Sequence, residues 1–172
     1  MEQNLVLIGF MGTGKTVVGR RLALRLGRRF IDTDAVIEEI TGLTIPRIFA
    51  RYGVVRFRAE EALLVQKLAR EKNLVIATGG GTVLNPENIR LLHERGILIG
   101  LTAPVEILYQ RLRNKKNRPL LRRGNFEEKI NSLLAEREGA YSMAEYTVNT
   151  GALSPDQVVN RIISYLKARE QV

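Results

Sequence analysis

The sequence predicts an α/β fold of three layers, in which helices flank both faces of a five-stranded parallel sheet. Two observations support this prediction. Short apolar runs typical of buried strands recur along the 172-residue chain, and segments with the apolar spacing of amphipathic helices separate them. Strands that alternate with helices favour a parallel sheet, and ligands of such sheets bind at the carboxyl ends of the strands.

Five segments are predicted to form the strands. The first of them, NLVLIGF, is a continuous apolar run, and the shorter runs that follow share its character. The predicted strands cover residues 4–10, 29–32, 73–78, 97–102 and 146–150.

The segments between the predicted strands have the apolar spacing of helices, and two of these helices have recognisable caps. Gly27 suits a C-cap, whereas Ser154-Pro155-Asp156-Gln157 combines an N-cap serine, a proline at the first helical position and a capping-box glutamine. The predicted helices cover residues 17–27, 34–41, 44–51, 57–72, a segment opened by Asn85-Pro86, residues 104–113, residues 126–144 and a last segment opened by Ser154.

Composition limits the class of protein. A hydrophobic content of 45% supplies one good core, so we expect a single domain over residues 1–172. The absence of cysteine excludes disulfides and thiolate metal sites, and His93 has no second histidine with which to bind a metal. The apolar runs are too short to span a membrane and the N-terminus enters a strand directly, so we expect a cytoplasmic protein without a membrane partner.

The net charge of +9 has two interpretations. Lysines and arginines spread along helices form solvated faces, but a large excess also attracts nucleotides, anionic metabolites or nucleic acid. The densest basic stretch, residues 114–125, contains a proline and a glycine, and the chain has no zinc-binding spacing and no RNA-binding box. We therefore expect no nucleic-acid partner, although a nucleic-acid-dependent ATPase stays an alternative.

The stretch GFMGTGKT, Gly9 to Thr16, follows the first predicted strand and precedes a predicted helix. It matches G-x-x-x-x-G-K-[ST], whose glycines let backbone N–H groups point at phosphate oxygens while the helix N-terminus adds its partial positive charge. Lys15 is expected to reach the β- and γ-phosphates, and the Thr16 hydroxyl to bind Mg²⁺. The alternative is a glycine-rich turn without a ligand.

Two carboxylates, Asp32 and Asp34, follow the second predicted strand directly. The strands that end at Thr78 and Thr102 offer no acid, so one of this pair is expected to serve the metal. Mg²⁺ needs only one or two protein ligands, which leaves the other carboxylate free to accept hydrogen bonds from an acceptor hydroxyl. The alternative is that Asp34 simply caps the following helix.

Several motifs in order resemble those of the shikimate kinase family, and the resemblance covers nearly the whole chain. They are GFMGTGKT (9–16), DTD (32–34), FRAEE (57–61), TGGG (78–81), RPLL (118–121) and REGAY (137–141). The resemblance implies a P-loop fold like that of nucleoside monophosphate kinases, a monomer, and ATP and Mg²⁺ as partners in catalysis. One departure is Ala144-Glu145, where the family usually has Ala-Asp.

The resemblance also implies an acceptor site. Arg58 and Arg137 are similar to the two arginines that bind the shikimate carboxylate, an anion that suits a guanidinium fork. Gly80 is expected to contact substrate through its backbone, Asp34 to hold the acceptor hydroxyls and Asp32 to associate with Mg²⁺. Without the motif context, an arginine on a helix is usually a surface charge and a glycine run a flexible turn.

At the nucleotide end, the resemblance implies that Lys15 and Arg118 stabilise the transferring phosphoryl group. Arg118 belongs to an expected mobile lid at about 114–125, separate from a substrate-binding region at about 33–61. Arg111 resembles the residue that stacks on adenine. The residues expected to bind the nucleotide are Gly12, Thr13, Gly14, Lys15, Thr16, Val17, Arg111 and Arg118.

Together these observations predict transfer of the ATP γ-phosphate to the 3-hydroxyl of shikimate, a step of aromatic amino acid biosynthesis. The position of transfer follows from the resemblance and not from the spacing of residues. Another small-metabolite P-loop kinase, such as a gluconate kinase, is the alternative within the same class.

Overall fold

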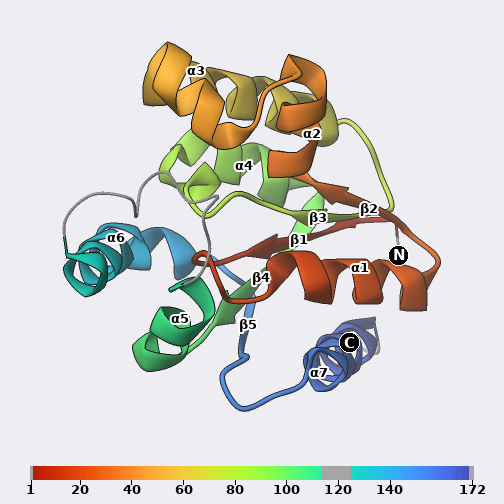
Figure 1. Ribbon diagram of the computed structural model, residues 1–172. Coiled ribbons are helices and arrows are strands. Elements are labelled where there is room, and N and C mark those ends of the chain that lie inside the picture. The colour runs from red at the N-terminus through yellow and green to blue at the C-terminus, as the bar shows by residue number, and fades with distance from the viewer. Residues whose placement is uncertain (1, 114–124, 171–172) are drawn as a thin grey trace.

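The computed structural model describes residues 2–113 and 125–170. Within them a sheet with the strand order β2-β3-β1-β4-β5 forms, and every neighbouring pair of strands is parallel. Helices cover both faces of this sheet (Figure 1), so the predicted three-layer α/β fold is confirmed. The strands are β1 (Asn4–Ile8), β2 (Arg29–Asp32), β3 (Leu74–Ala77), β4 (Gly96–Thr102) and β5 (Tyr146–Asn149).

The helices connect these strands in sequence order, and one short 3₁₀ turn follows β3. They are α1 (Lys15–Leu26), α2 (Thr33–Thr41), α3 (Ile45–Leu68), η1 (Thr82–Leu84), α4 (Pro86–Glu94), α5 (Val105–Leu112), α6 (Phe126–Tyr141) and α7 (Pro155–Glu170).

The observed elements differ from the predicted ones mainly at their ends: α3 ends at Leu68 rather than at residue 72, and α6 ends at Tyr141 rather than at residue 144. The first strand ends at Ile8 rather than at residue 10, because Gly9 has a φ of 143° and its missing Cβ would meet the Leu101 carbonyl. The two helices predicted at 44–51 and 57–72 are confirmed as two helical segments that meet at a kink inside α3, where Gly53 has φ 78° and ψ 175°. Only glycine adopts such a backbone conformation readily, so it marks a sharp change of direction in α3.

The predicted caps are confirmed. The Ser154 N–H donates to Oε1 of Gln157 at 2.8 Å, and the Gln157 N–H donates to Oγ of Ser154 at 3.3 Å, which completes a capping box. Gly27 ends α1 with a φ of 63°, and Asn85 caps α4 by accepting from the Glu87 N–H. None of the helices in the part of the chain that the structure describes is long and apolar enough to cross a membrane.

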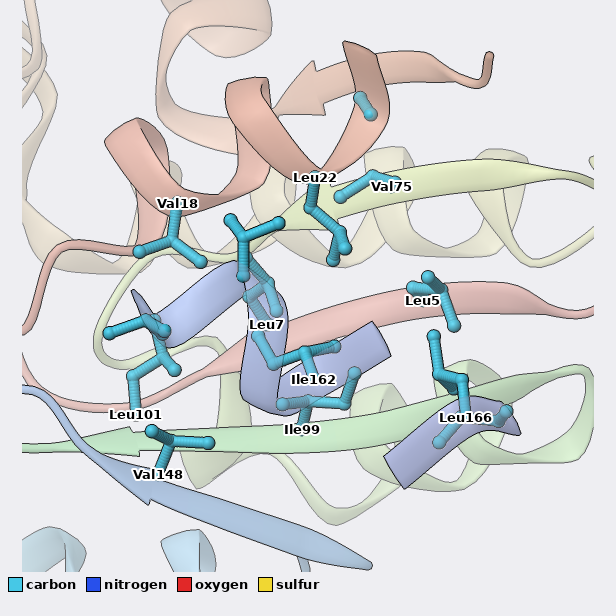
Figure 2. Close-up of a cluster of buried hydrophobic side chains, with 14 residues drawn as sticks. Leu5, Leu7, Val18, Leu22, Val75, Ile99, Leu101, Val148, Ile162 and Leu166 are labelled. Carbon is cyan, nitrogen blue, oxygen red and sulfur yellow. The ribbon is translucent and has the colours of Figure 1, made fainter. Parts of the chain in front are cut away.

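Alternation along β1 divides the core between the two faces of the sheet. Leu5 and Leu7 face α1 and α7, whereas Val6 and Ile8 face α3 and α4. Figure 2 shows the first of these layers, where Leu22 and Ile162 from the two helices meet side chains from four strands. Burial of this apolar surface on both faces fixes the strands and the loops at their ends.

The parallel register brings the carboxyl ends of the strands to one edge. Asp32 of β2 lies opposite Ala77 of β3, and Thr102 of β4 lies opposite Asn149 of β5. The loop after β1 lies between them because β1 occupies the centre of the sheet. The residues that follow all five strands therefore surround a single region, as expected for this class of fold.

Candidate active site

A cavity of about 710 Å³ opens at this edge of the sheet. Its walls come from the loops after β1, β3 and β5, from the end of β2 with the start of α2, and from α1, α3, α5, α6 and α7. The cavity is lined by every predicted site residue that the structure describes: Gly12, Thr13, Gly14, Lys15, Thr16, Val17, Asp32, Asp34, Arg58, Gly80, Arg111 and Arg137. Arg118 and most of the expected lid lie outside the described residues.

The loop Gly9 to Thr16 forms a cradle at the N-terminus of α1. Gly12 and Gly14 have φ values of 83° and 97°, which turn successive backbone amides in a way that side chains would hinder. Gly14 is also the N-cap of α1 and makes no side-chain cap, so the first amides of the helix remain directed at the cavity. This arrangement suits a phosphate group.

Lys15 lies within this loop and is buried. Its Nζ donates to the carbonyls of Gly9 at 2.7 Å and Phe10 at 2.9 Å. These two bonds hold the ammonium group at the bottom of the cradle, where it adds a full positive charge to the partial charge of the helix. Val17 is half exposed and lines the cavity two residues further along α1.

The two carboxylates of DTD have different surroundings. Asp32 is the N-cap of α2: its Oδ1 accepts from the N–H groups of Asp34 and Ala35, and its Oδ2 accepts from the Thr16 hydroxyl at 2.6 Å. The alternative that Asp34 caps this helix is wrong, because α2 begins at Thr33 and Asp34 already lies in its first turn. Asp34 points toward the glycine run, where a Cβ on Gly79 would lie 2.8 Å from its Oδ1.

Arg58 is held by a buried carboxylate one turn away on α3. Its NH1 lies 2.6 Å from Oε2 of Glu61, whose side chain is 1% exposed. The other oxygen of Glu61 accepts from the Thr82 hydroxyl. The ion pair therefore orients the guanidinium group toward the cavity and leaves part of it accessible, since the Arg58 side chain is 30% exposed.

Arg137 approaches the same glycine run from α6. It is buried, its guanidinium carbon lies 5.8 Å from the centre of the Phe10 ring, and its NH1 would lie 3.3 Å from a Cβ on Gly80. Among the described residues its Nε has no hydrogen-bond partner. A buried guanidinium with a donor to spare suits an anionic ligand.

Two side chains form hydrogen bonds to the backbone of the glycine run. The Thr33 hydroxyl accepts from the Gly79 N–H at 2.9 Å, and the Tyr141 hydroxyl donates to the Gly80 carbonyl. A side chain on Gly81 would collide with the Arg58 guanidinium group. These glycines allow charged side chains to approach the backbone closely.

Arg111 forms three hydrogen bonds within the protein. NH1 donates to the Gly12 carbonyl and to the Thr150 hydroxyl, and NH2 donates to the Thr150 carbonyl, each at 3.0 Å. These bonds engage the edge of the guanidinium group. A planar group held by its edge can still present a face for stacking.

Four side chains that shape the site had no predicted role: Thr33, Glu61, Tyr141 and Thr150. Glu61 and Tyr141 stand three and four residues after the predicted arginines, on the same helical faces, so helical spacing could have indicated them. Thr33 lies between the two predicted aspartates. Thr150 follows the last strand and carries no local signal, because its side-chain contacts with Arg111, Thr102 and Thr13 lie 39, 48 and 137 residues away in the sequence.

A hard cation is compatible with the oxygens beside the cradle. The Thr16 hydroxyl and the Asp32 carboxylate lie together, and Mg²⁺ prefers such oxygens with water and phosphate completing its octahedron. In the parts of the chain that are described, no three acidic, histidine or cysteine side chains gather into a metal site of their own. The donor set therefore fits a metal bound mainly through phosphate.

Sequence comparison identifies the family. The sequence model described as shikimate kinase matches residues 11–167. The chain belongs to the shikimate kinase family. It is 63% identical over 170 residues to a shikimate kinase from Pelotomaculum thermopropionicum, with 99% of each chain covered. The predicted family is thus confirmed.

Structural comparison agrees with this family. A shikimate kinase from Acinetobacter baumannii, solved in complex with shikimate, superimposes with a TM-score of 0.94 at 42% identity, covering 98% of this chain and 95% of that one. A gluconokinase from Sinorhizobium meliloti is 17% identical with a TM-score of 0.59, and covers 98% and 97% of the two chains. That second similarity shows a common fold alone and gives no support to the gluconate kinase alternative.

Proposed function

We propose that this protein transfers the γ-phosphate of ATP to the 3-hydroxyl of shikimate, yielding ADP and shikimate 3-phosphate. One observation carries the proposal. A phosphate cradle containing Lys15 shares its cavity with Asp34, Arg58 and Arg137, which surround the glycine run after β3. The membership of the shikimate kinase family, and a relative solved with shikimate, support the choice of acceptor.

The acceptor end of the cavity suits a ring with one carboxylate and several hydroxyls. Arg58 and Arg137 supply two guanidinium groups for the carboxylate, and the Gly80 backbone offers close approach between them. Asp34, beside Gly79, accepts hydrogen bonds from the hydroxyls. Phe57 contributes an apolar wall from α3, next to Arg58.

Phosphoryl transfer requires mainly alignment and charge stabilisation. Asp34 orients the attacking hydroxyl and accepts its proton, while the amides of the cradle and Lys15 stabilise the charge on the transferring group. The Thr16 hydroxyl and the Asp32 carboxylate would hold Mg²⁺, which would supply positive charge to the phosphates when bound. We assign Arg118 to the same transition state and Arg111 to the adenine, as predicted from the motifs.

The proposal also includes the domain organisation, the oligomeric state, the location and the partners of the enzyme. We propose that residues 1–172 act as one kinase domain, that the enzyme is a cytoplasmic monomer, and that neither nucleic acid nor a membrane is its partner. The net charge of +9 then serves anionic substrates, since both ATP and shikimate are negatively charged.

The test is ADP formation from MgATP by the purified protein with shikimate, gluconate, a nucleoside monophosphate or single-stranded RNA added separately. We expect turnover with shikimate alone, and a phosphorus NMR spectrum of the product that places the new ester on the 3-oxygen. Asp34→Asn should lose most of kcat while retaining nucleotide binding. Turnover with another acceptor, or only with RNA, would refute the assignment of Asp34, Arg58 and Arg137.

A further inference from the structure

The backbone carbonyls on the outward side of the phosphate cradle need hydrogen-bond donors. When successive amides of a loop converge on an anion, their carbonyl oxygens diverge from it, and each buried carbonyl requires a donor. The cradle supplies two donors itself: the Thr13 hydroxyl donates to the Phe10 carbonyl at 2.7 Å, and Lys15 donates to the carbonyls of Gly9 and Phe10.

The carbonyls of Gly12 and Thr13 receive their donors from distant parts of the chain. Arg111 of α5 donates to the Gly12 carbonyl at 3.0 Å. The Thr150 hydroxyl, just after β5, lies 3.0 Å from the Thr13 carbonyl and 3.1 Å from the Thr102 carbonyl, and its single proton is shared between them. Side chains from α5 and from the segment after β5 thus hold the middle of the cradle by hydrogen bonds.

Thr150 occupies the centre of this arrangement. It is 3% exposed, and its own N–H donates to the Thr102 carbonyl at 2.8 Å, which fixes its backbone to the end of β4. Two of the three hydrogen bonds of Arg111 end on Thr150, one on its hydroxyl and one on its carbonyl. One threonine therefore links the cradle, the end of β4 and the guanidinium group of Arg111.

We infer that Thr150 is a positioning residue of the nucleotide site. Its hydroxyl holds the Thr13 carbonyl outward, which keeps the neighbouring amides directed at the phosphates, and it accepts from Arg111, which keeps that guanidinium group at the wall of the cavity. The inference rests on the proposed use of the cradle for ATP but not on the identity of the acceptor.

The test is the dissociation constant for MgADP of Thr150→Val, measured by calorimetry in the absence of any acceptor. Valine keeps the shape of threonine and removes the hydroxyl, so we expect binding about fivefold weaker than in the natural protein, equivalent to about 1 kcal/mol. Thr150→Ser restores a hydroxyl and should bind within about twofold of the natural protein.

Thr41→Val is the matched control, because the Thr41 hydroxyl also donates to a carbonyl, that of Ile37, but outside this cavity. We expect its MgADP affinity to stay unchanged. Equal affinity in Thr150→Val and the natural protein would overturn the inference, and so would a fall in melting temperature without a change in affinity. If Thr150→Val does not fold, Thr150→Ala carries the same expectation without placing a methyl group against the carbonyls.

The two proposals fail in different ways. If shikimate is not the acceptor, the MgADP measurement still reports on Thr150, because no acceptor is present. If shikimate is phosphorylated at the normal rate and Thr150→Val binds MgADP normally, the inference about Thr150 alone is refuted.

Discussion

The Tyr141 hydroxyl donates a hydrogen bond to the Gly80 carbonyl at 2.5 Å. Tyr141 stands at the end of α6, one helical turn after Arg137, whose guanidinium group lies against the same glycine. A single turn of helix thus fixes both the backbone of Gly80 and the cation beside it. This geometry prepares the glycine run for a carboxylate before any ligand arrives.

Tyr141→Phe should therefore weaken acceptor binding without affecting the nucleotide. Phenylalanine keeps the aromatic ring and removes the hydroxyl, which donates to the Gly80 carbonyl and also interacts with Arg137, so we expect the KM for shikimate to rise at least about fivefold, for a bond worth about 1 kcal/mol. The KM for MgATP should stay unchanged.

Steady-state kinetics with each substrate varied in turn measures this split. Tyr109→Phe is the matched control, because its hydroxyl donates to Asn131 on an exposed face away from the glycine run. An unchanged KM for shikimate in Tyr141→Phe would mean that the bond to Gly80 only stabilises the fold.

The stability of the protein at alkaline pH should depend on the ionisation of Tyr141. Burial raises the pKa of Tyr141 from 10.0 to about 12. Because the folded pKa lies above the unfolded one, the native state binds this proton more tightly. Its contribution to stability is complete below pH 10 and is lost as the pH rises toward 12.

The expected contribution is at most about 3 kcal/mol, from a shift of about two pKa units. Urea unfolding of the natural protein and Tyr141→Phe at intervals between pH 9 and about 11.5 measures it, because all other titrating groups are common to both proteins. We expect the free energy of unfolding to fall less steeply with pH in Tyr141→Phe. Parallel curves would contradict the burial of this hydroxyl.

Much of this architecture could be predicted from local sequence because its determinants are local. Apolar runs predicted the strands and helical spacing predicted the helices. The motif Gly9 to Thr16 stands where a strand meets a helix. Capping at Ser154 follows from four adjacent residues. Each of these signals depends on neighbours in the chain, which is the range over which sequence patterns carry physical meaning.

Other features depend on contacts that local sequence does not contain. Asp32 rather than Asp34 caps α2, because α2 begins at Thr33, directly after the end of β2, and the Thr16 hydroxyl holds the Asp32 carboxylate in place. Thr150 meets Thr13 only when β1, β4 and β5 have assembled side by side, so no spacing within one segment indicates it.

Arg58 is predicted to affect both acceptor binding and stability. Arg58→Ala removes a charged hydrogen bond to the substrate carboxylate, so acceptor binding should weaken by roughly 1.5–3 kcal/mol while ATP affinity stays nearly intact. It also leaves the buried Glu61 carboxylate without its cation, which should lower the free energy of unfolding by a similar amount, about 1.5–3 kcal/mol.

The double variant Arg58→Ala with Glu61→Gln separates the two effects. Glutamine removes the uncompensated charge and keeps an acceptor for the Thr82 hydroxyl, so stability should partly recover while the KM for shikimate stays high. Recovery of the KM together with stability would indicate that Arg58 acts only through the fold.

The assignment of the cap to Asp32 makes a prediction about stability. Asp32→Ala removes the acceptor for two amides of α2 and should cost about 1 kcal/mol in the free energy of unfolding, whereas Asp32→Asn, which still caps, should cost less. Asp34→Asn should change it by no more than about 0.5 kcal/mol, because Asp34 does not cap the helix. Urea unfolding of the three variants distinguishes these expectations, and a larger loss for Asp34→Asn than for Asp32→Ala would reverse the assignment.

Gly81→Ala should reproduce the kinetic effect of losing Arg58 while the arginine is still present. With a φ of −105°, Gly81 has a backbone conformation that alanine adopts without strain. A Cβ there would lie 2.7 Å from Cζ of Arg58 and still closer to NH2, so the guanidinium group must move away from its position beside the glycine run. We expect a KM for shikimate raised roughly tenfold, as for a lost hydrogen bond to a charged group, with the KM for MgATP unchanged.

Gly27→Ala provides the control for Gly81→Ala. Gly27 has a positive φ of 63° and open space around its Cα, so alanine there strains the C-cap of α1 and should cost about 1 kcal/mol of stability without any kinetic effect. Gly27→Ala therefore shows how far a loss of stability alone changes the KM for shikimate. If Gly81→Ala leaves the KM for shikimate unchanged, the position that Arg58 occupies beside Gly81 is not the one that binds the acceptor, and the arginine must reach the carboxylate from elsewhere in the cavity.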